Sequence, residues 1–191
     1  PSIVIKPTTG LKWLNLMELW EYRELIYFLT MRDIKVRYKQ TALGAAWALL
    51  QPVGMMVAFT VFFGNLANIP SEGIPYPVFV YTALLPWLVF SRGISEAASS
   101  LVGDQRLITR VYFPRLIVPL AVVLASMVDF SISFLVLIGL MFYFGLMPTA
   151  AIWTLPLFIL LMLLTSFGMG FWLSALNIEY RDVRYILPFL N

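Results

Sequence analysis

The residues able to perform chemistry are few, and the most unusual of them is a single carboxylate within a long apolar stretch. Asp129 lies between the charge-free segments 116–128 and 130–178. A charged side chain at membrane depth is costly unless it is neutralised or paired. Serines lie nearby, but the stretch contains no basic partner and no chain of acids. Asp129 therefore has two interpretations, a structural hydrogen-bonding role and a proton relay.

Most other kinds of catalytic chemistry are excluded by residue type. The chain contains no cysteine and no histidine, which excludes disulfides, thiol nucleophiles, imidazole bases and the usual transition-metal sites. A serine–histidine hydrolase is excluded for the same reason. No Gly-x-x-x-x-Gly-Lys-Ser/Thr phosphate loop occurs, and no paired carboxylates face a common pocket. We therefore expect that the chain is not an enzyme and that it holds no cofactor or metal.

The composition indicates that lipid is the solvent for this chain. Of its 191 residues, 61% are hydrophobic and 12% are charged, whereas soluble domains carry about 25% charged residues. The mean hydropathy is +0.86. A soluble domain of this length could not bury so much apolar surface. The sequence therefore predicts a membrane protein, and we expect no nucleic acid among its partners.

The distribution of charges predicts how many times the chain crosses the membrane. A helix needs about 20 apolar residues to cross the hydrocarbon core. The charge-free segment 130–178 must therefore contain more than one crossing, and Gly145 to Pro148 is its natural break. We expect an all-α, polytopic membrane protein with four transmembrane helices in this sequence, at about 42–66, 74–91, 117–144 and 151–176.

The basic residues predict the orientation of these spans. Of the 13 Lys and Arg residues, seven precede the first span, four lie between the second and third, and two lie in the tail. None lies in the short loops near 67–73 and 145–150. By the positive-inside rule, the N-terminus, the middle loop and the tail are cytoplasmic.

The first 41 residues form a cytoplasmic segment, and residues 42–191 form the transmembrane domain. Within the first segment, apolar side chains recur at helical spacing and form one stripe, at Tyr27, Met31, Ile34 and Tyr38. Basic side chains form a neighbouring stripe, at Arg32, Lys35 and Lys39. This pattern predicts an amphipathic helix that lies in the membrane interface. The helix is either an electrostatic anchor or a docking surface for a cytoplasmic partner, and the two roles are compatible.

Small residues within the spans predict close helix packing. The first span contains Gly54 and Ala58, and Pro52 is expected to kink it. The fourth span repeats the pattern, with small residues at Ser166, Gly170 and Ser174.

The loop between the second and third spans predicts a short amphipathic helix outside the membrane. Gly103 and Asp104 end one helix and start another, and Leu107 and Val111 are expected on one face of the turn that follows. Basic residues lie at its edges, at Arg106 and Arg110. A helix of this kind fits a cleft in a soluble partner.

Several separated motifs resemble the permease subunits of type-2 ABC exporters for polysaccharides and polyol phosphates. The motifs are Arg32-Asp-Ile-Lys-Val-Arg-Tyr-Lys-Gln-Thr-Ala-Leu-Gly44 leading to Trp47 and Gln51-Pro52, Leu85-Pro-Trp87, Leu107-Ile-Thr-Arg-Val-Tyr-Phe-Pro-Arg115 with Pro119, and Leu176-Asn-Ile-Glu-Tyr-Arg-Asp-Val-Arg184 with Pro188. The resemblance covers nearly the whole chain. Because the family has six spans, it implies that this sequence stops before the fifth.

The resemblance implies a homodimeric channel in the bacterial cytoplasmic (inner) membrane, driven by a separate ABC ATPase subunit that binds ATP and Mg. The substrate would be a lipid-linked polysaccharide such as an O-antigen, a capsule or a teichoic-acid-like polymer. The implied ATPase contacts are Arg32, Lys35, Lys39, Asp104, Arg106, Leu107, Arg110 and Val111. The implied residues of the translocation path or of dimer packing are Trp47, Gln51, Pro52 and Trp87. The alternative is a membrane-embedded enzyme or scaffold that acts on lipid-linked sugars.

Overall fold

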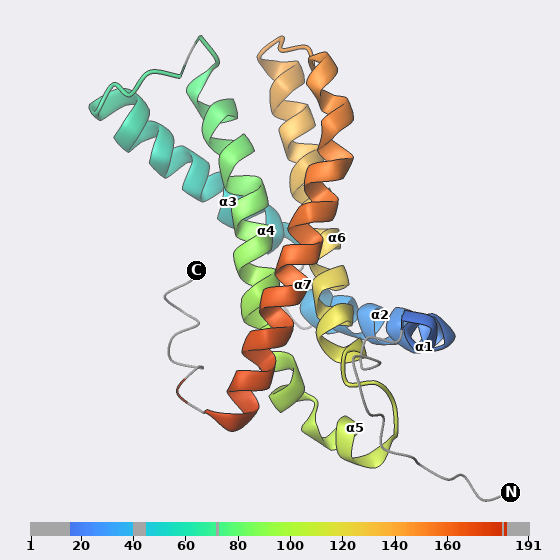
Figure 1. Cartoon of the computed structure of the whole chain (residues 1–191). Helices are drawn as coiled ribbons and strands as arrows, with labels where there is room; N and C mark the ends of the chain where they lie inside the picture. Colours follow the sequence, from blue (N-terminus) through green and yellow to red (C-terminus); the bar gives the residue numbers. More distant parts are fainter. Residues whose placement is uncertain (1–15, 40–44, 72, 181, 183–191) are drawn as a thin grey trace, which may run out of the picture.

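The computed structural model describes residues 16–39, 45–71, 73–180 and 182, and every regular element among them is a helix. Three long helices run together through the bundle, and a fourth leans away from them at one end (Figure 1). In chain order the elements are α1 (Leu16–Glu21), α2 (Arg23–Lys39), α3 (Ala45–Phe59), η2 (Thr60–Leu66), α4 (Tyr76–Gly103), α5 (Gln105–Arg110), α6 (Ile117–Tyr143), η3 (Ala150–Thr154) and α7 (Leu155–Glu179).

Four of these helical segments are long and apolar enough to cross a membrane, namely Leu49–Leu66, Tyr76–Gly103, Ile117–Tyr143 and Ile152–Glu179. The prediction of an all-α protein with four spans is therefore confirmed. The second span differs in length from the predicted 74–91, because α4 continues as one helix to Gly103. Trp87 consequently lies near the middle of α4 rather than at its end. Asp104 then separates α4 from α5, as the sequence predicted.

Small residues allow α4 and α7 to approach closely. A methyl group added at Gly170 would lie 2.6 Å from the Cβ of Ala97. Ser166 and Ser174, one turn before and after Gly170, are also buried. The small residues of the fourth span therefore serve helix packing. Gly54 of α3, by contrast, is exposed and has no neighbouring atom within 4 Å in the described part of the chain.

The π-helix η2 (Thr60–Leu66) forms the last turns of the first span, before the connection to α4. At Gly64 an added Cβ would lie 2.9 Å from the ring of Tyr76, the first residue of α4. Only a glycine permits this approach without displacing the ring. The contact fixes the end of η2 against the beginning of α4 and so sets the geometry of this hairpin.

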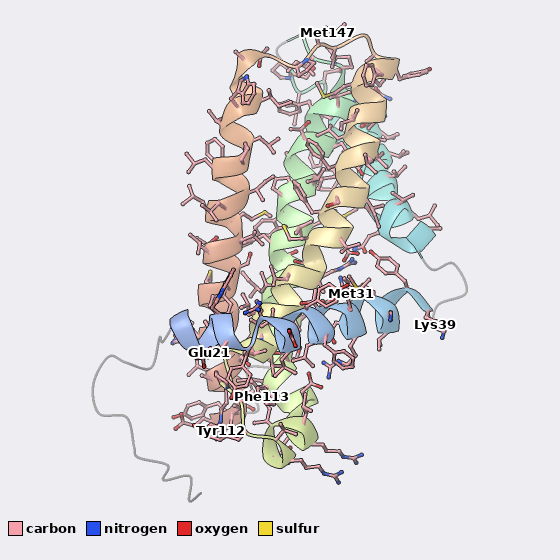
Figure 2. The ribbon with its side chains drawn as sticks, turned by 90° about the vertical axis from the view of Figure 1, so that its right-hand side faces the viewer. Glu21, Met31, Lys39, Tyr112, Phe113 and Met147 are labelled. Carbon is pink, nitrogen blue, oxygen red and sulfur yellow. The ribbon has the colours of Figure 1, made fainter. Side chains whose placement is uncertain are left out.

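Helix α2 lies across the bundle, so that Glu21 and Lys39 lie on opposite sides of the long helices (Figure 2). We refer to the end of the bundle that carries α2 and α5 as the α5 end, and to the opposite end as the Met147 end. Leu29 is 3% exposed and packs with Ile117 and Ala121 of α6. The Thr30 hydroxyl donates to the carbonyl of Ile26, at 2.8 Å.

Helix α2 has a face that packs against the protein, separate from the apolar stripe that the sequence predicts for the membrane interface. Tyr22, Leu25, Ile26 and Leu29 pack against the bundle, whereas Tyr27 is 65% exposed. Because α2 has apolar residues on several sides, more than one face could be buried. The face that is buried is the one that contacts the apolar surface near the start of α6. The structure thus gives α2 a protein-packed face that the sequence analysis did not predict.

Candidate functional site

Asp129 of α6 accepts hydrogen bonds from three side chains of two other helices. One carboxylate oxygen, Oδ1, accepts from the hydroxyl of Tyr38. The other oxygen, Oδ2, accepts from Arg37 and, at 3.3 Å, from Arg92 of α4. Asp129 is only 4% exposed. Burial, followed by the hydrogen bond to Asp129 and its negative charge, raises the pKa of Tyr38, so Tyr38 stays protonated and acts as a donor.

The expectation that Asp129 has no basic partner is therefore wrong. Arg37 lies 92 positions earlier in the chain and reaches it because α2 crosses α6. Arg92 reaches it because α4 continues beyond residue 91 as a regular helix beside α6. A buried carboxylate is tolerated when its charge is paired and its lone pairs accept hydrogen bonds. These contacts meet both conditions and favour the structural hydrogen-bonding interpretation of Asp129.

The same arginines extend the contacts of Asp129 to two further side chains. Arg37 donates its second terminal nitrogen to Glu96 of α4. Arg92 donates Nη2 to Oε1 of Gln51 in α3, at 2.6 Å. We call the set of Arg37, Tyr38, Gln51, Arg92, Glu96 and Asp129 the Asp129 network. It connects α2, α3, α4 and α6.

Gln51 and Pro52, predicted for the translocation path or dimer packing, face the interior of the bundle. Together with Arg92 and Asp129 they line a small cavity of about 20 Å³, which has room for one water molecule. Pro52 is buried. Trp87 is different, because it is 53% exposed on α4. Trp47 belongs to α3, but its side chain lies outside the described residues.

A second ion pair ties α2 to the junction between α4 and α5. Arg32 donates to both carboxylate oxygens of Asp104, at 3.0 and 2.6 Å, and to Asp33 at 2.9 Å. The hydrogen bond to Asp104 is the main cause that raises the pKa of Arg32, and burial raises the pKa of Asp33. Arg32 and Asp104 were both predicted to contact an ATPase, and in this chain they contact each other.

The remaining predicted ATPase contacts are exposed, with one exception. Lys35 and Lys39 are exposed on α2, and Arg106 and Arg110 are exposed on α5. The exception is Leu107, which is partly buried.

Leu107 and Val111 do not share one apolar face. Leu107 is partly buried and packs in the cluster that contains Leu29 and Phe113. Val111 follows the last residue of α5 in extended conformation and is 52% exposed. The expected common face is corrected because the short helix ends before Val111. Tyr112 is 76% exposed and lies at the α5 end in Figure 2.

Arg37, Arg92, Tyr38 and Glu96 were not among the predicted site residues. One local signal was available, since Arg92 and Glu96 are four residues apart and share a helix face. Nothing local linked either of them to Asp129 or to Arg37. Among the described residues, no group of three acidic residues is arranged to hold a metal ion.

Comparison with known protein families defines the class of this chain. Residues 24–191 match the family described as ABC-2 type transporter, in its membrane domain. The match includes α2, the four spans and all residues of the Asp129 network. The chain therefore belongs to the ABC-2 transporter membrane family, and the predicted resemblance is confirmed.

Individual relatives carry more specific names. The chain is 31% identical over 172 residues to the O-antigen export system permease protein RfbA of Myxococcus xanthus, which covers 89% of this chain and 65% of that protein. It is 28% identical over 162 residues to the protein of that name from Klebsiella pneumoniae, covering 84% and 62%. The polysialic acid transport protein KpsM of Escherichia coli is 28% identical over 79 residues, covering 41% and 31%. The chain thus spans slightly less than two thirds of the length of the O-antigen permeases.

Proposed function

We propose that this chain is the membrane permease of an ATP-driven exporter that moves a lipid-linked polysaccharide across the bacterial cytoplasmic membrane. The observation that carries this proposal is the similarity, over 89% of the chain, to a protein named as an O-antigen export permease. A second group of relatives is named for the transport of another polysaccharide, polysialic acid. An O-antigen, a capsule or a teichoic-acid-like polymer is the substrate class that fits both.

The proposed energy source is a separate ATPase subunit that binds ATP and Mg and docks at the α5 end. Exposed cations on α2 and α5 support this, because charges at the rim of an interface steer and orient a partner. The apolar groups available for contact are Val111 and Tyr112, both more than half exposed. The proposed cytoplasmic side is therefore the α5 end, with the N-terminus on that side.

The proposed division of labour makes a direct prediction about nucleotide binding. The permease purified without its partner is expected to show no binding of ATP at micromolar concentrations, measured by equilibrium dialysis with labelled nucleotide. The complex with the ATPase serves as the positive control. Micromolar binding by the permease alone would contradict the assignment of ATP hydrolysis to another subunit.

A second copy of the permease is the proposed partner within the membrane. The outward faces of α3, η2 and α7 carry large exposed apolar side chains, including Val57, Phe62, Phe158 and Leu164. Such faces contact lipid tails or another transmembrane helix. In this homodimer we assign Trp47 and Trp87 to the path of the glycan or to dimer packing, whereas Gln51 and Pro52 face the interior of the bundle.

The test is deletion of the gene in the source bacterium, followed by quantification of surface polysaccharide and of the intracellular lipid-linked glycan. An exporter predicts loss of the surface polymer and accumulation of the complete glycan inside the cell, both reversed by the wild-type gene. An enzyme acting on lipid-linked sugars predicts a glycan of altered structure instead. Unchanged surface polysaccharide would contradict both functions.

A further inference from the structure

The Asp129 network forms an unbroken path of polar contacts from α2 to α3. The path runs from Arg37 of α2 to Asp129 of α6, on to Arg92 of α4, and from there to Gln51 of α3. Each step is a hydrogen bond, and the first two also join opposite charges. The helix that crosses the bundle is thereby connected to the first transmembrane span through two helices of the core.

The network contains more charge partners than a static ion pair requires. Oδ2 of Asp129 accepts from both arginines, and Arg37 has a second carboxylate partner in Glu96. If α2 moved and withdrew Arg37 from Asp129, Arg92 would still neutralise the buried carboxylate, and Arg37 would still pair with Glu96. Oδ1 of Asp129 would lose its donor Tyr38, which neighbours Arg37 on α2, but no buried charge would be left alone. The rearrangement therefore avoids the main cost of breaking a buried ion pair.

Helix α3 is the element best able to respond to such a rearrangement. Only 11% of the first span is buried in the described bundle, against 44% for the second and third spans. The fourth span is 6% buried, but it is held against α4 by the close contact at Gly170. Pro52 removes one backbone hydrogen bond inside α3 and makes the helix easier to bend at this point. Gln51, which Arg92 holds at 2.6 Å, is the residue immediately before this proline. The bond to Arg92 therefore restrains α3 beside its weakest point.

We propose that Asp129 is a positioning residue that transmits movements of α2 to α3, an inference that rests on the proposed function. In the described state, Arg92 is shared between Asp129 and Gln51. When the ATPase displaces α2 and withdraws Arg37, Arg92 turns fully to Asp129 and releases Gln51. Helix α3 is then free to tilt at Pro52, and the first span changes its position relative to α4.

The absence of cysteine allows this movement to be measured with pairs of introduced spin labels. Labels at Val36 of α2 and Ser99 of α4 report the movement of α2, and labels at Leu50 of α3 and Ser99 report the movement of α3. All three residues are exposed. In the complex of permease and ATPase in lipid nanodiscs, both distances are expected to change when ATP is added. In the Asp129→Asn complex, the first distance should still change and the second should not.

Transport measurements provide a second readout in proteoliposomes that contain the complex. Asp129→Asn is expected to lower the amount of glycan exported per ATP hydrolysed at least tenfold, while ATP hydrolysis stays within about threefold of wild type. Gln51→Leu removes the last contact of the path without altering the buried carboxylate, so it should uncouple export in a folded protein. Gln51→Asn retains a neutral amide acceptor for Arg92 and should recover export at least fivefold relative to Gln51→Leu.

The matched control is Ser131→Ala, because Ser131 is exposed on α6 and its hydroxyl donates to its own helix, at Met127. In this variant, both label distances should change on addition of ATP, and glycan export should equal that of the wild type. The proposal is overturned if α3 moves normally in Asp129→Asn, if Gln51→Leu exports normally, or if wild type exports glycan without either distance changing. A wild-type complex that hydrolyses ATP but exports no glycan would instead remove the proposed function, and this proposal with it.

Discussion

At the scale of single residues, the structure depends on a few side chains whose neighbours lie far away in the sequence. Asp129 is buried in an apolar helix, and both of its oxygens are occupied by donors from α2 and α4. Gly170 similarly derives its role from Ala97, 73 positions earlier, whose methyl group occupies the space beside it.

Replacing Gly170 with alanine is expected to destabilise the permease by about 1–3 kcal/mol, because the added methyl group would overlap Ala97 and force α4 and α7 apart. The measurement is the thermal unfolding midpoint of the purified protein in detergent. Gly168→Ala is the matched control on the same helix, since the space at Gly168 is open, and it should change stability by less than about 1 kcal/mol.

The double variant Gly170→Ala, Ala97→Gly tests whether this overlap is the cause. Removing the methyl group of Ala97 should restore most of the lost stability, because the total volume at the contact is then unchanged. Equal midpoints for Gly170→Ala and wild type would show that the two helices do not lie as close as described.

Arg32 is expected to be poorly replaced by lysine. The guanidinium group donates to both oxygens of Asp104, and an ammonium group cannot reproduce this fork. Because the two side chains are 32% and 23% exposed, water screens the pair and the expected loss in Arg32→Lys is about 1 kcal/mol. A double-mutant cycle with Asp104→Asn measures the interaction, and a coupling energy of zero would contradict it.

At the scale of elements, α2 and α5 are held to the bundle on one side and exposed on the other. Helix α2 contributes Leu29 to the cluster that also contains Phe113, and α5 contributes Leu107. Their cations, including Lys35 and Arg110, are exposed. The segment after α5 adds the exposed side chains of Val111 and Tyr112. These elements can therefore present a partner with a surface without being released from the spans.

Val111→Asp combined with Tyr112→Asp should abolish ATPase recruitment while leaving the permease folded. Both side chains are exposed, so charges there are hydrated in the free permease but would be desolvated in an apolar interface. Co-purification of the ATPase with the tagged permease measures recruitment. Leu107→Asp is the contrasting variant, because a charge in its partly buried site should lower the unfolding midpoint. Normal recruitment by the double variant would show that this segment is only a linker.

At the scale of the whole molecule, the described chain has two chemically different ends. The α5 end carries the ion pairs, the exposed arginines of α5 and the crossing helix α2. The Met147 end carries the two short connections between spans, which contain no lysine or arginine. Between them, the apolar helices are long enough to cross the hydrocarbon core. This asymmetry is the physical basis of the proposed orientation.

The orientation is tested by labelling single introduced cysteines, which is straightforward in a chain without native cysteine. A membrane-impermeant maleimide added to intact spheroplasts is expected to react at Ile69 and Thr149, and to leave Thr109 unlabelled until the membrane is opened. Ile69 and Thr149 lie in the two connections at the Met147 end, and Thr109 is exposed on α5. Labelling of Thr109 alone in intact cells would reverse the orientation.

The number and type of the transmembrane elements follow from the sequence alone. The long apolar segments predicted all four spans. In lipid, the backbone N–H and C=O groups of such a segment must bond to each other, and a helix satisfies this requirement within one segment. Gly103 and Asp104 located the end of α4, and the small residues around Gly170 predicted close packing. The motifs predicted the family that the comparison then confirmed. All of these are properties of residues close together in the chain.

The pairing of the charged residues depends on how distant helices pack. Arg37 and Asp129 are 92 positions apart, and their contact exists because α2 crosses the bundle at the level of Asp129. The same crossing determines which face of α2 is buried, and it places Arg32 within hydrogen-bonding distance of Asp104. Local periodicity constrains the face of a single helix, whereas the partner of a buried charge depends on where distant helices meet. For this reason the spans followed from the sequence and the Asp129 network did not.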